Sequence, residues 1–315
     1  MHTLETMTST GRPAETRTII GRPAQAQTIG VLQRVLRPRA RGPEPERQEA
    51  ELSDFFAAYV DAGRPGVRHY LRHPRATARA VQALLAQPRL TARLGAGREA
   101  EAVATGLTHK TGIGRTVLHT ASSVLELPKE AGAYASGAGR QTLRRKSRAA
   151  ERAGVRWAEV TDPAERLELV RLSSARERIH PQAQYRWVDA ENSHLLDHRL
   201  WLAAYGTDDE PLMLSVTPVE GEWALLRYFR TLTDSDAASN ARYLMTGVLV
   251  EQLVGRGVRY LTDGTSPIGL PNGLRHFQRM LGWRIYPVRV VRTGRVEARE
   301  LAEPVLVGAG TSSRP

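Results

Sequence analysis

Apolar residues in the second half of the 315-residue chain occur in short runs that alternate with longer amphipathic segments. Short runs rich in apolar and β-branched residues predict strands, whereas apolar positions that repeat every three to four residues predict helices. The predicted strands cover residues 155–160, 200–205, 211–217, 222–229, 258–262 and 284–291, and the predicted helices cover 164–178, 241–255 and 272–281. The strand–helix–strand step over residues 222–264 predicts two parallel strands joined by a crossover helix.

The first half of the chain has a different pattern. Residues 51–94 repeat apolar positions with helical spacing, and Pro65 and Pro74 divide this stretch into short helices. Residues 101–107 and 116–127 have the composition of two strands. We therefore expect helices first and a strand pair after them.

One predicted helix, over residues 139–153, is strongly basic. Its arginines at positions 140, 144, 148 and 152 fall four residues apart, so they lie along one side of the helix. Such a stripe repels itself unless an anionic group lies beside it. It is either a solvated helix face or a contact surface for an anionic carrier or acceptor.

These patterns divide the chain into four parts. Residues 1–48 hold few large apolar residues and many Pro, Thr, Arg and Gln, which predicts a disordered basic tail. Residues 49–154 are expected to form an N-terminal helical or α+β half. Residues 155–300 are expected to form the main α/β domain, and residues 301–315 a flexible tail.

The composition excludes several classes of protein. Hydrophobic residues make up 41% and charged residues 25%, which is typical of a soluble globular protein. No apolar run reaches the ~18 residues of a membrane span and no secretory signal is visible, so we expect a cytoplasmic protein without a membrane span. The absence of cysteine excludes disulfides and a cysteine nucleophile. His194 and His198 share a helix face, but no third ligand stands out, so we expect no metal.

The positive charge is concentrated in one half of the chain. Residues 1–150 carry 24 Lys and Arg against 12 Asp and Glu, whereas residues 151–315 carry 21 of each. This asymmetry indicates an anionic partner for the first half, such as nucleic acid, phosphate groups or acidic lipid. The preference for Arg over Lys is also what a GC-rich coding bias produces, but such a bias does not explain the scarcity of acids in one half only.

Three segments resemble the GNAT acyltransferase superfamily, and its FemAB-like and BioF2-like branch in particular. They are Ser122–Pro128 followed by the Arg-rich helix, then 240–264, which ends in Asp-Gly, and the Gly-Leu-x-x-Phe segment Gly273–Gly282. The resemblance covers roughly residues 95–292. It implies a GNAT-type mixed twisted sheet flanked by helices, in which residues 49–154 form either a second half of the same type or a helical cap.

The resemblance also implies where acyl transfer would take place. The cleft would lie where the strands 222–230 and 258–264 splay apart. Asp263 would accept the proton of the attacking amine, and Tyr228 would donate a proton. The simpler interpretations are a turn residue for Asp263 and a core residue for Tyr228. The expected donor or carrier contacts are Arg140, Arg144, Arg148, Arg230, Thr265, Ser266, Asn272 and Arg275.

The identity of the acyl donor stays open at this point. Acetyl-CoA-dependent members carry a Gly-containing loop that binds pyrophosphate at a helix N-terminus. Residues 230–240 contain no glycine here, and Asp234 and Asp236 would repel pyrophosphate. The FemAB-like branch uses aminoacyl-tRNA in several members. We therefore expect either acyl-CoA or aminoacyl-tRNA as the donor, with tRNA as a partner in the second case, and an amine-bearing acceptor.

Two other classes of function fit the same sequence. One is a non-catalytic GNAT-like module that binds nucleic acid or another polyanion through the basic N-terminal half. The other is a structural or interaction protein with a degenerate site. The likeness in fold does not by itself establish activity.

Overall fold

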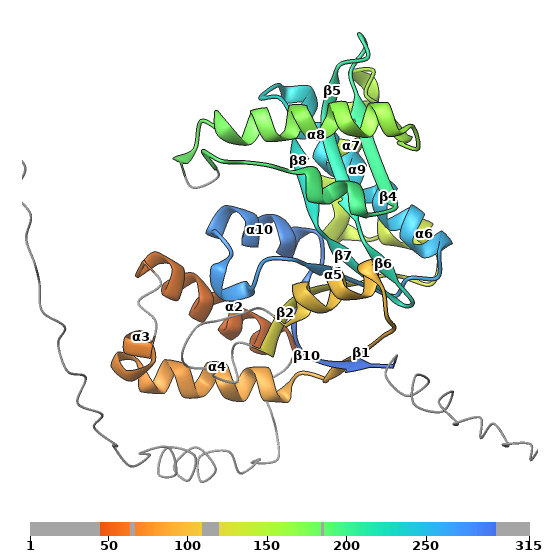
Figure 1. The fold of residues 1–315 in the computed structure, drawn as a ribbon. Helices are drawn as coiled ribbons and strands as arrows, with labels where there is room; N and C mark the ends of the chain where they lie inside the picture. The colour runs from red at the N-terminus through yellow and green to blue at the C-terminus, as the bar shows by residue number, and fades with distance from the viewer. Residues whose placement is uncertain (1–44, 64–66, 109–119, 184–185, 294–315) are drawn as a thin grey trace, which may run out of the picture. The chain divides into compact units, whose positions relative to one another are not determined.

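The computed structural model describes residues 45–63, 67–108, 120–183 and 186–293. They belong to one compact unit, Gly42–Pro315, and the other unit, Met1–Arg41, lies outside the described residues. As the sequence predicts, the fold is mixed α/β, with a twisted mixed sheet flanked by helices (Figure 1). The two predicted tails lie outside the described residues, except that the helix α2 (Pro45–Asp61) begins before residue 49.

Ten strands of the described residues form two sheets. One sheet has the order β1-β10-β2-β9-β7-β6 and the other the order β3-β4-β5-β8. The neighbours β1 and β10 are parallel, as are β7 and β9, and the remaining pairs are antiparallel. The strands are β1 (Leu90–Leu94), β2 (Ala121–Glu126), β3 (Arg156–Glu159), β4 (Leu200–Tyr205), β5 (Pro211–Thr217), β6 (Val219–Glu220), β7 (Trp223–Leu226), β8 (Tyr228–Thr231), β9 (Tyr260–Asp263) and β10 (Arg284–Arg292).

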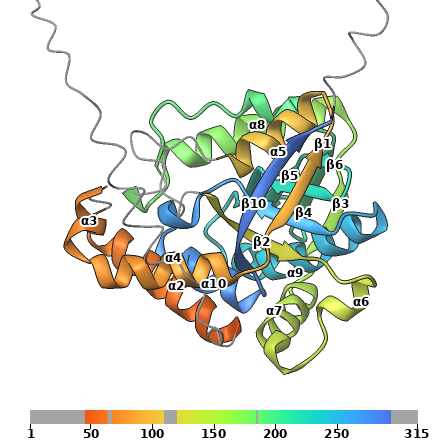
Figure 2. The ribbon, with the colours of Figure 1, turned by 90° about the horizontal axis from the view of Figure 1, so that it is seen from below.

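Helices cover both faces of the six-stranded sheet. Because side chains alternate along a strand, Trp223 and Leu225 of β7 pack with α5 (Arg98–Leu107), whereas Ala224 packs with α9 (Asp236–Gly255). Figure 2 shows α5 beside β1 and β10. The other helices are α3 (Val67–Arg72), α4 (Pro74–Ala86), α6 (Ala131–Tyr134), α7 (Gln141–Arg152), α8 (Pro163–Arg178) and α10 (Asn272–Met280), with short 3-10 helices that include η4 (Ser193–Asp197).

The strand predicted over residues 222–229 is in fact two strands in different sheets. The break falls at Arg227, whose backbone N–H donates to the Leu225 carbonyl at 2.8 Å. On one side β7 pairs in parallel with β9 up to the Leu226–Asp263 position, and on the other side β8 pairs with β5. The crossover between β7 and β9 contains α9, as predicted. The two sheets therefore diverge at the carboxyl ends of β7 and β9.

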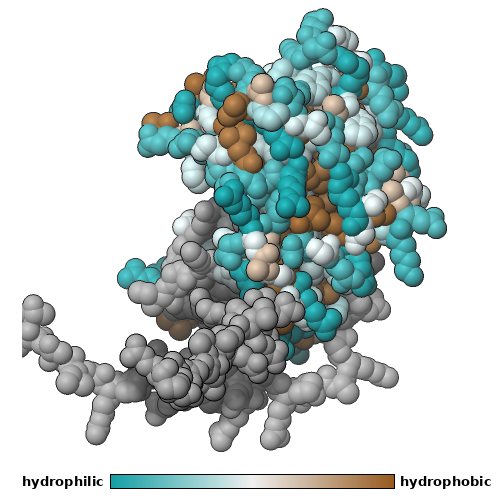
Figure 3. All heavy atoms as spheres, turned by 45° about the vertical axis from the view of Figure 1, so that its right-hand side comes forward, coloured by the Kyte–Doolittle hydropathy of each residue, from teal (hydrophilic) through white to brown (hydrophobic). Residues whose placement is uncertain are grey.

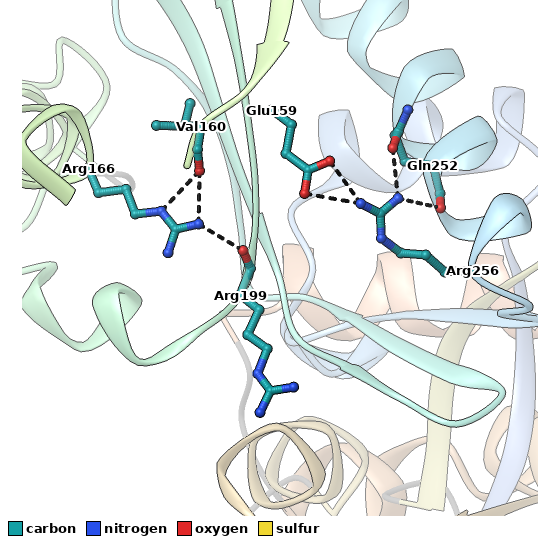
Figure 4. Close-up of polar contacts among 6 residues, drawn as sticks. All are labelled: Glu159, Val160, Arg166, Arg199, Gln252 and Arg256. Carbon is teal, nitrogen blue, oxygen red and sulfur yellow. Dashed lines mark hydrogen bonds and ion pairs between the residues drawn. The ribbon is translucent and has the colours of Figure 1, made fainter. Parts of the chain in front are cut away.

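Two arginines anchor the strand β3 and the helix α8 (Figure 4). Arg256, at the end of α9, forms an ion pair with Glu159 at 2.8 Å. Arg166, in α8, donates hydrogen bonds to the carbonyls of Val160 and Arg199 at 2.8 and 3.0 Å. The Arg256 pair holds β3 against the end of α9, and the Arg166 contacts hold α8, which carries a buried glutamate described below, against the four-stranded sheet.

The prediction of a strand over residues 101–107 is wrong, because this segment belongs to the helix α5. Its buried residues Ala100, Val103, Ala104 and Leu107 follow helical spacing, and its alanines favour a helix. The helical pattern predicted up to residue 94 ends earlier, since residues 90–94 form the strand β1. The predicted strand over 116–127 is confirmed as β2 from residue 121, and residues 116–119 lie outside the described residues.

The sheet order joins distant parts of the chain. The strands β1 and β2, from the expected N-terminal half, pair with β10 and β9. The boundary expected between residues 154 and 155 stays a prediction. Most of the described surface in Figure 3 is hydrophilic, with apolar residues in limited areas. Within the ranges that the structure describes, no helix combines the length and hydrophobicity needed to cross a membrane.

Candidate active site

A cavity of about 410 Å³ opens where the two sheets diverge. Residues from β8, β9, α8 and α10 line it, together with the segment 187–194 that leads into η4. Aromatic and aliphatic side chains form much of the wall, and charged groups reach into it from several elements. A concave, largely apolar pocket with a few converging polar groups is the usual form of a substrate site.

Asp263 is one of two buried carboxylates that line this cavity, the other being Glu177. Asp263 ends β9, opposite Leu226 of β7, and its side chain is 7% exposed. The backbone N–H of Thr265 donates to it at 2.7 Å and the Gln278 side-chain amide at 2.5 Å. Burial raises the pKa of Asp263 to about 6, and the hydrogen bonds from Thr265 and Gln278 oppose that rise. At neutral pH this carboxylate is mostly ionised, and its pKa is close enough to 7 for it to accept a proton from a substrate.

Tyr228, Glu177 and Arg230 form a second polar group on the cavity wall. Glu177 of α8 pairs with Arg230 of β8 at 2.9 Å, and the Arg230 guanidinium lies 5.7 Å from the centre of the Tyr228 ring. Burial, and then the charge of Glu177, raise the pKa of Tyr228. Its hydroxyl oxygen is itself buried. Tyr228 therefore stays protonated at neutral pH.

The structure brings together only some of the residues predicted for the site. Asp263, Tyr228, Arg230 and Thr265 all line the cavity. The lining set does not include Ser266, whose hydroxyl oxygen is buried nearby.

Asn272 and Arg275 have other partners. The side-chain amide of Asn272 donates to Asp61 at 2.6 Å. Arg275 is buried and donates to the carbonyls of Pro267 and Leu270 at 3.1 and 3.0 Å, and burial lowers its pKa to about 10. Its guanidinium holds the turn after β9 and is not among the groups that line the cavity.

The arginine stripe of α7 also lies apart from the cavity lining. Arg140 donates to the Met280 carbonyl at 2.8 Å, and Arg144 donates to the carbonyls of Ala135 and Gly137 at 2.7 Å each. Arg148 is exposed. Half of the stripe therefore satisfies backbone acceptors, and the other half faces solvent.

Several cavity residues were not predicted from the sequence. Glu177 lies in a helix whose charges resemble those of a solvated face, and only its burial reveals it. Gln278 donates to Asp263, and no feature of the sequence indicated this contact. Trp187, Asp189 and Glu191 come from a stretch without regular structure.

The two histidines predicted to share a helix face have different surroundings. His194 lines the cavity, where burial and then the charge of Arg227 lower its pKa. His198 is buried and its Nδ1 lies 3.1 Å from Glu99. In the described part of the chain, no three His, Cys, Asp or Glu side chains are arranged to hold a metal ion.

The segment 230–240, which lacks the glycines of a pyrophosphate-binding loop, also carries acidic side chains at the start of α9 in the structure. Ser235 caps α9 by accepting a hydrogen bond from the Ala238 N–H at 3.1 Å. Asp236 occupies the first turn, and Asp234 forms an ion pair with Arg176. The first turn of α9 is thus capped by the Ser235 side chain and carries Asp236, which disfavours a phosphate on the backbone N–H groups of that turn.

No protein-family model matches the chain, and no curated protein matches it in sequence. Solved structures that resemble it include a C-terminal domain assigned to a lysylphosphatidylglycerol synthetase of Agrobacterium fabrum, with 14% identity, a TM-score of 0.39 and coverage of 53% of this chain and 61% of that one. L-PGS from Bacillus licheniformis has 16% identity and a TM-score of 0.37, and the match covers 53% of this chain and 59% of that one. A conserved protein of unknown function from Bacteroides thetaiotaomicron has 11% identity and a TM-score of 0.40, and the match covers 53% of this chain and 58% of that one.

The matched part of this chain thus spans less than two thirds of each of these structures. Identities and TM-scores this low do not establish a shared fold or function. The resemblance to the GNAT superfamily stays a prediction from the sequence.

Proposed function

We propose that this protein is an acyltransferase that moves an acyl group onto an amine in the cavity beside Asp263. One observation carries the proposal: a buried carboxylate with a pKa of about 6 ends β9 where β7 and β9 diverge, and it lines a cavity large enough for a substrate. An amine that attacks a carbonyl must lose a proton, and a carboxylate of near-neutral pKa can accept it at physiological pH.

In the proposed reaction the amine nitrogen attacks the acyl carbonyl carbon. The new C–N bond forms and the bond from that carbon to the sulfur or oxygen of the carrier breaks. The proton of the amine passes to Asp263, directly or through a water, and Asp263 then returns it by the same route to the departing sulfur or oxygen of the carrier, which restores the carboxylate. Gln278 and the Thr265 backbone N–H hold the carboxylate in place. Because its pKa is raised and its hydroxyl is buried, Tyr228 is better suited to shaping the cavity than to acting as an acid.

Either acyl-CoA or aminoacyl-tRNA fits as the donor. The Ser235 cap and the Asp236 carboxylate argue against binding pyrophosphate on the backbone N–H groups at the amino end of α9. They do not argue against a carrier whose phosphates are held elsewhere. The acceptor is an amine-bearing molecule. Four acidic residues line the cavity (Glu177, Asp189, Glu191 and Asp263) against two arginines (Arg227 and Arg230), and this acidic excess favours a cationic acceptor.

A non-catalytic polyanion-binding module remains the second candidate, and the exposed end of the α7 stripe favours it. Arg145, Arg148 and Arg152 are exposed, and none of them forms an ion pair with a described residue. Arginines of this kind contact phosphate groups without reading a sequence.

The test is transfer of radiolabelled acyl groups from acyl-CoAs and from aminoacylated tRNA to a panel of amines, with Asp263→Asn beside the wild type. We expect Asp263→Asn to lower kcat at pH 7 by about 10²–10⁴-fold, the usual contribution of a general base. Asp208→Asn, at an exposed turn, is the control and should leave kcat unchanged. Transfer by the wild type that survives Asp263→Asn would remove Asp263 from the mechanism. Polyanion binding without transfer from any donor would favour the second candidate.

A further inference from the structure

A second cavity, of about 480 Å³, lies next to the candidate active site. Both cavities are lined by the same six residues, which form their common wall: Glu177, Tyr228, Phe229, Arg230, Leu274 and Phe277. A substrate that fills both would therefore pass along β8 and α10. The proposed acyl transfer beside Asp263 assigns no role to the second cavity.

The second cavity has an excess of positive charge. Arg176 from α8, Arg230 from β8 and Arg242 from α9 line it, against the carboxylates of Glu177 and Asp234. Glu177 already pairs with Arg230, and Asp234 pairs with Arg176. Arg242 is the third arginine, and neither carboxylate neutralises its charge.

Arg242 is held in place without an anionic partner. Its guanidinium lies 5.5 Å from the centre of the Phe277 ring, which forms part of the common wall. The side chain is half-buried, and it forms no ion pair with any residue that the structure describes. A planar guanidinium fixed on an aromatic ring matches the paired oxygens of a phosphate, and partial burial strengthens that attraction.

We propose that the second cavity is a phosphate-binding site, in which Arg242 contacts a phosphate group of the acyl carrier. The binding of phosphate follows from the cavity itself, and only the identity of the ligand as the acyl carrier rests on the proposed function. The acyl group would then reach across the common wall toward Asp263. CoA thioesters and aminoacyl-tRNA both carry the required phosphate.

The test measures binding to the full chain by isothermal titration calorimetry, with pyrophosphate, CoA and deacylated tRNA as probes. Arg242→Gln removes the charge and keeps a polar side chain. Arg93→Gln, on an exposed position of β1, is the matched control. We expect at least one probe to bind the wild type and Arg93→Gln equally, and to bind Arg242→Gln about tenfold more weakly, as the loss of one charge-assisted hydrogen bond implies.

The comparison between probes identifies the source of the phosphate. Binding of CoA alone points to a thioester carrier, and binding of tRNA without CoA points to an aminoacyl-tRNA. If none of the three probes binds, or if Arg242→Gln binds them as the wild type does while its circular dichroism is unchanged, the proposal is overturned.

This result is separable from the proposed function. Asp263→Asn should keep phosphate binding, because Asp263 does not line the second cavity. Phosphate binding that depends on Arg242, in a protein with no transfer activity, supports this site and contradicts the acyltransferase. Transfer with an unchanged donor KM in Arg242→Gln supports the acyltransferase and contradicts this site.

Discussion

The burial of Asp263 is the feature of single residues on which the proposed chemistry depends. A carboxylate that is 7% exposed loses most of its hydration, and hydrogen bonds from Thr265 and Gln278 replace part of it. A buried carboxylate of this kind costs stability, and such groups are common at functional sites. That cost gives a prediction that does not require the substrate.

The pH dependence of stability should reveal the buried carboxylate. The pKa of Asp263 rises from 3.8 in the unfolded chain to about 6 in the folded state, so the folded state binds more protons between these values. Stability therefore falls as pH rises through this window, by about 3 kcal/mol at most. We expect Asp263→Asn, which cannot ionise, to gain stability relative to the wild type as pH increases from 4 to 7. Denaturant unfolding at several pH values measures the difference. A constant difference across this range would show that the carboxylate is not perturbed.

A second prediction at this scale concerns Arg275, which the sequence suggested as a donor contact. Its guanidinium satisfies two carbonyls of the turn after β9, so Arg275→Ala should lose more than about 2 kcal/mol of unfolding free energy. Arg279→Ala, exposed on the same helix, should change stability by less than about 0.5 kcal/mol. Unfolding in urea measures both. If Arg275→Ala unfolds at the wild-type urea concentration but binds the acyl donor more weakly, then Arg275 contacts the donor, as the sequence suggested.

At the scale of helices and strands, the sequence predicts most elements but misses where the chain changes sheets. The strands β4 and β5 have the predicted bounds, because their apolar runs are bounded by turn residues. The break at Arg227 is invisible in the sequence, since the residues on both sides favour strands. The helix α5 was missed because its short apolar residues fit either structure until a sheet packs on them.

The sequence also predicted only part of the candidate site. Asp263 ends a strand after a recognisable helix, so its position follows from local pattern and resemblance. Glu177 and Arg242 come from helices whose register against β8 depends on tertiary packing. Arg140, Arg144 and Arg275 were expected to contact a ligand, but a sequence does not show that each of them donates to backbone carbonyls of the same chain.

The arginine stripe of α7 gives a prediction that separates its two ends. Arg140 binds the last turn of α10 and lies close to Gly282, where the backbone has a φ of +83° and an added side chain would collide with the guanidinium. We expect Arg140→Ala to lose about 1–2 kcal/mol of unfolding free energy, and Arg148→Ala to lose less than about 0.5 kcal/mol. Thermal unfolding of both variants is the measurement. Equal effects would contradict a structural role confined to one end of the stripe.

In the molecule as a whole, one cavity holds the proposed base, the adjoining cavity holds an arginine without an ion pair among the described residues, and the Glu177–Arg230 pair lies in their common wall. Residues distant in sequence build this arrangement, since Glu177 comes from α8, Arg242 from α9 and Asp263 from β9. Opposite charges on the two sides of one wall suit a substrate with an anionic carrier at one end and an amine at the other.

The most direct test of this account is the pH dependence of kcat/KM for acyl transfer in the wild type. A base must be ionised to accept a proton, so activity should fall as pH decreases through about 6, the pKa of Asp263. This fall in activity below about pH 6, the acidic limb of the profile, should be absent from the residual activity of Asp263→Asn and present in Asp208→Asn. A profile that is flat from pH 5 to 8, or a limb near 6 that persists in Asp263→Asn, would contradict the assignment of Asp263 as the base.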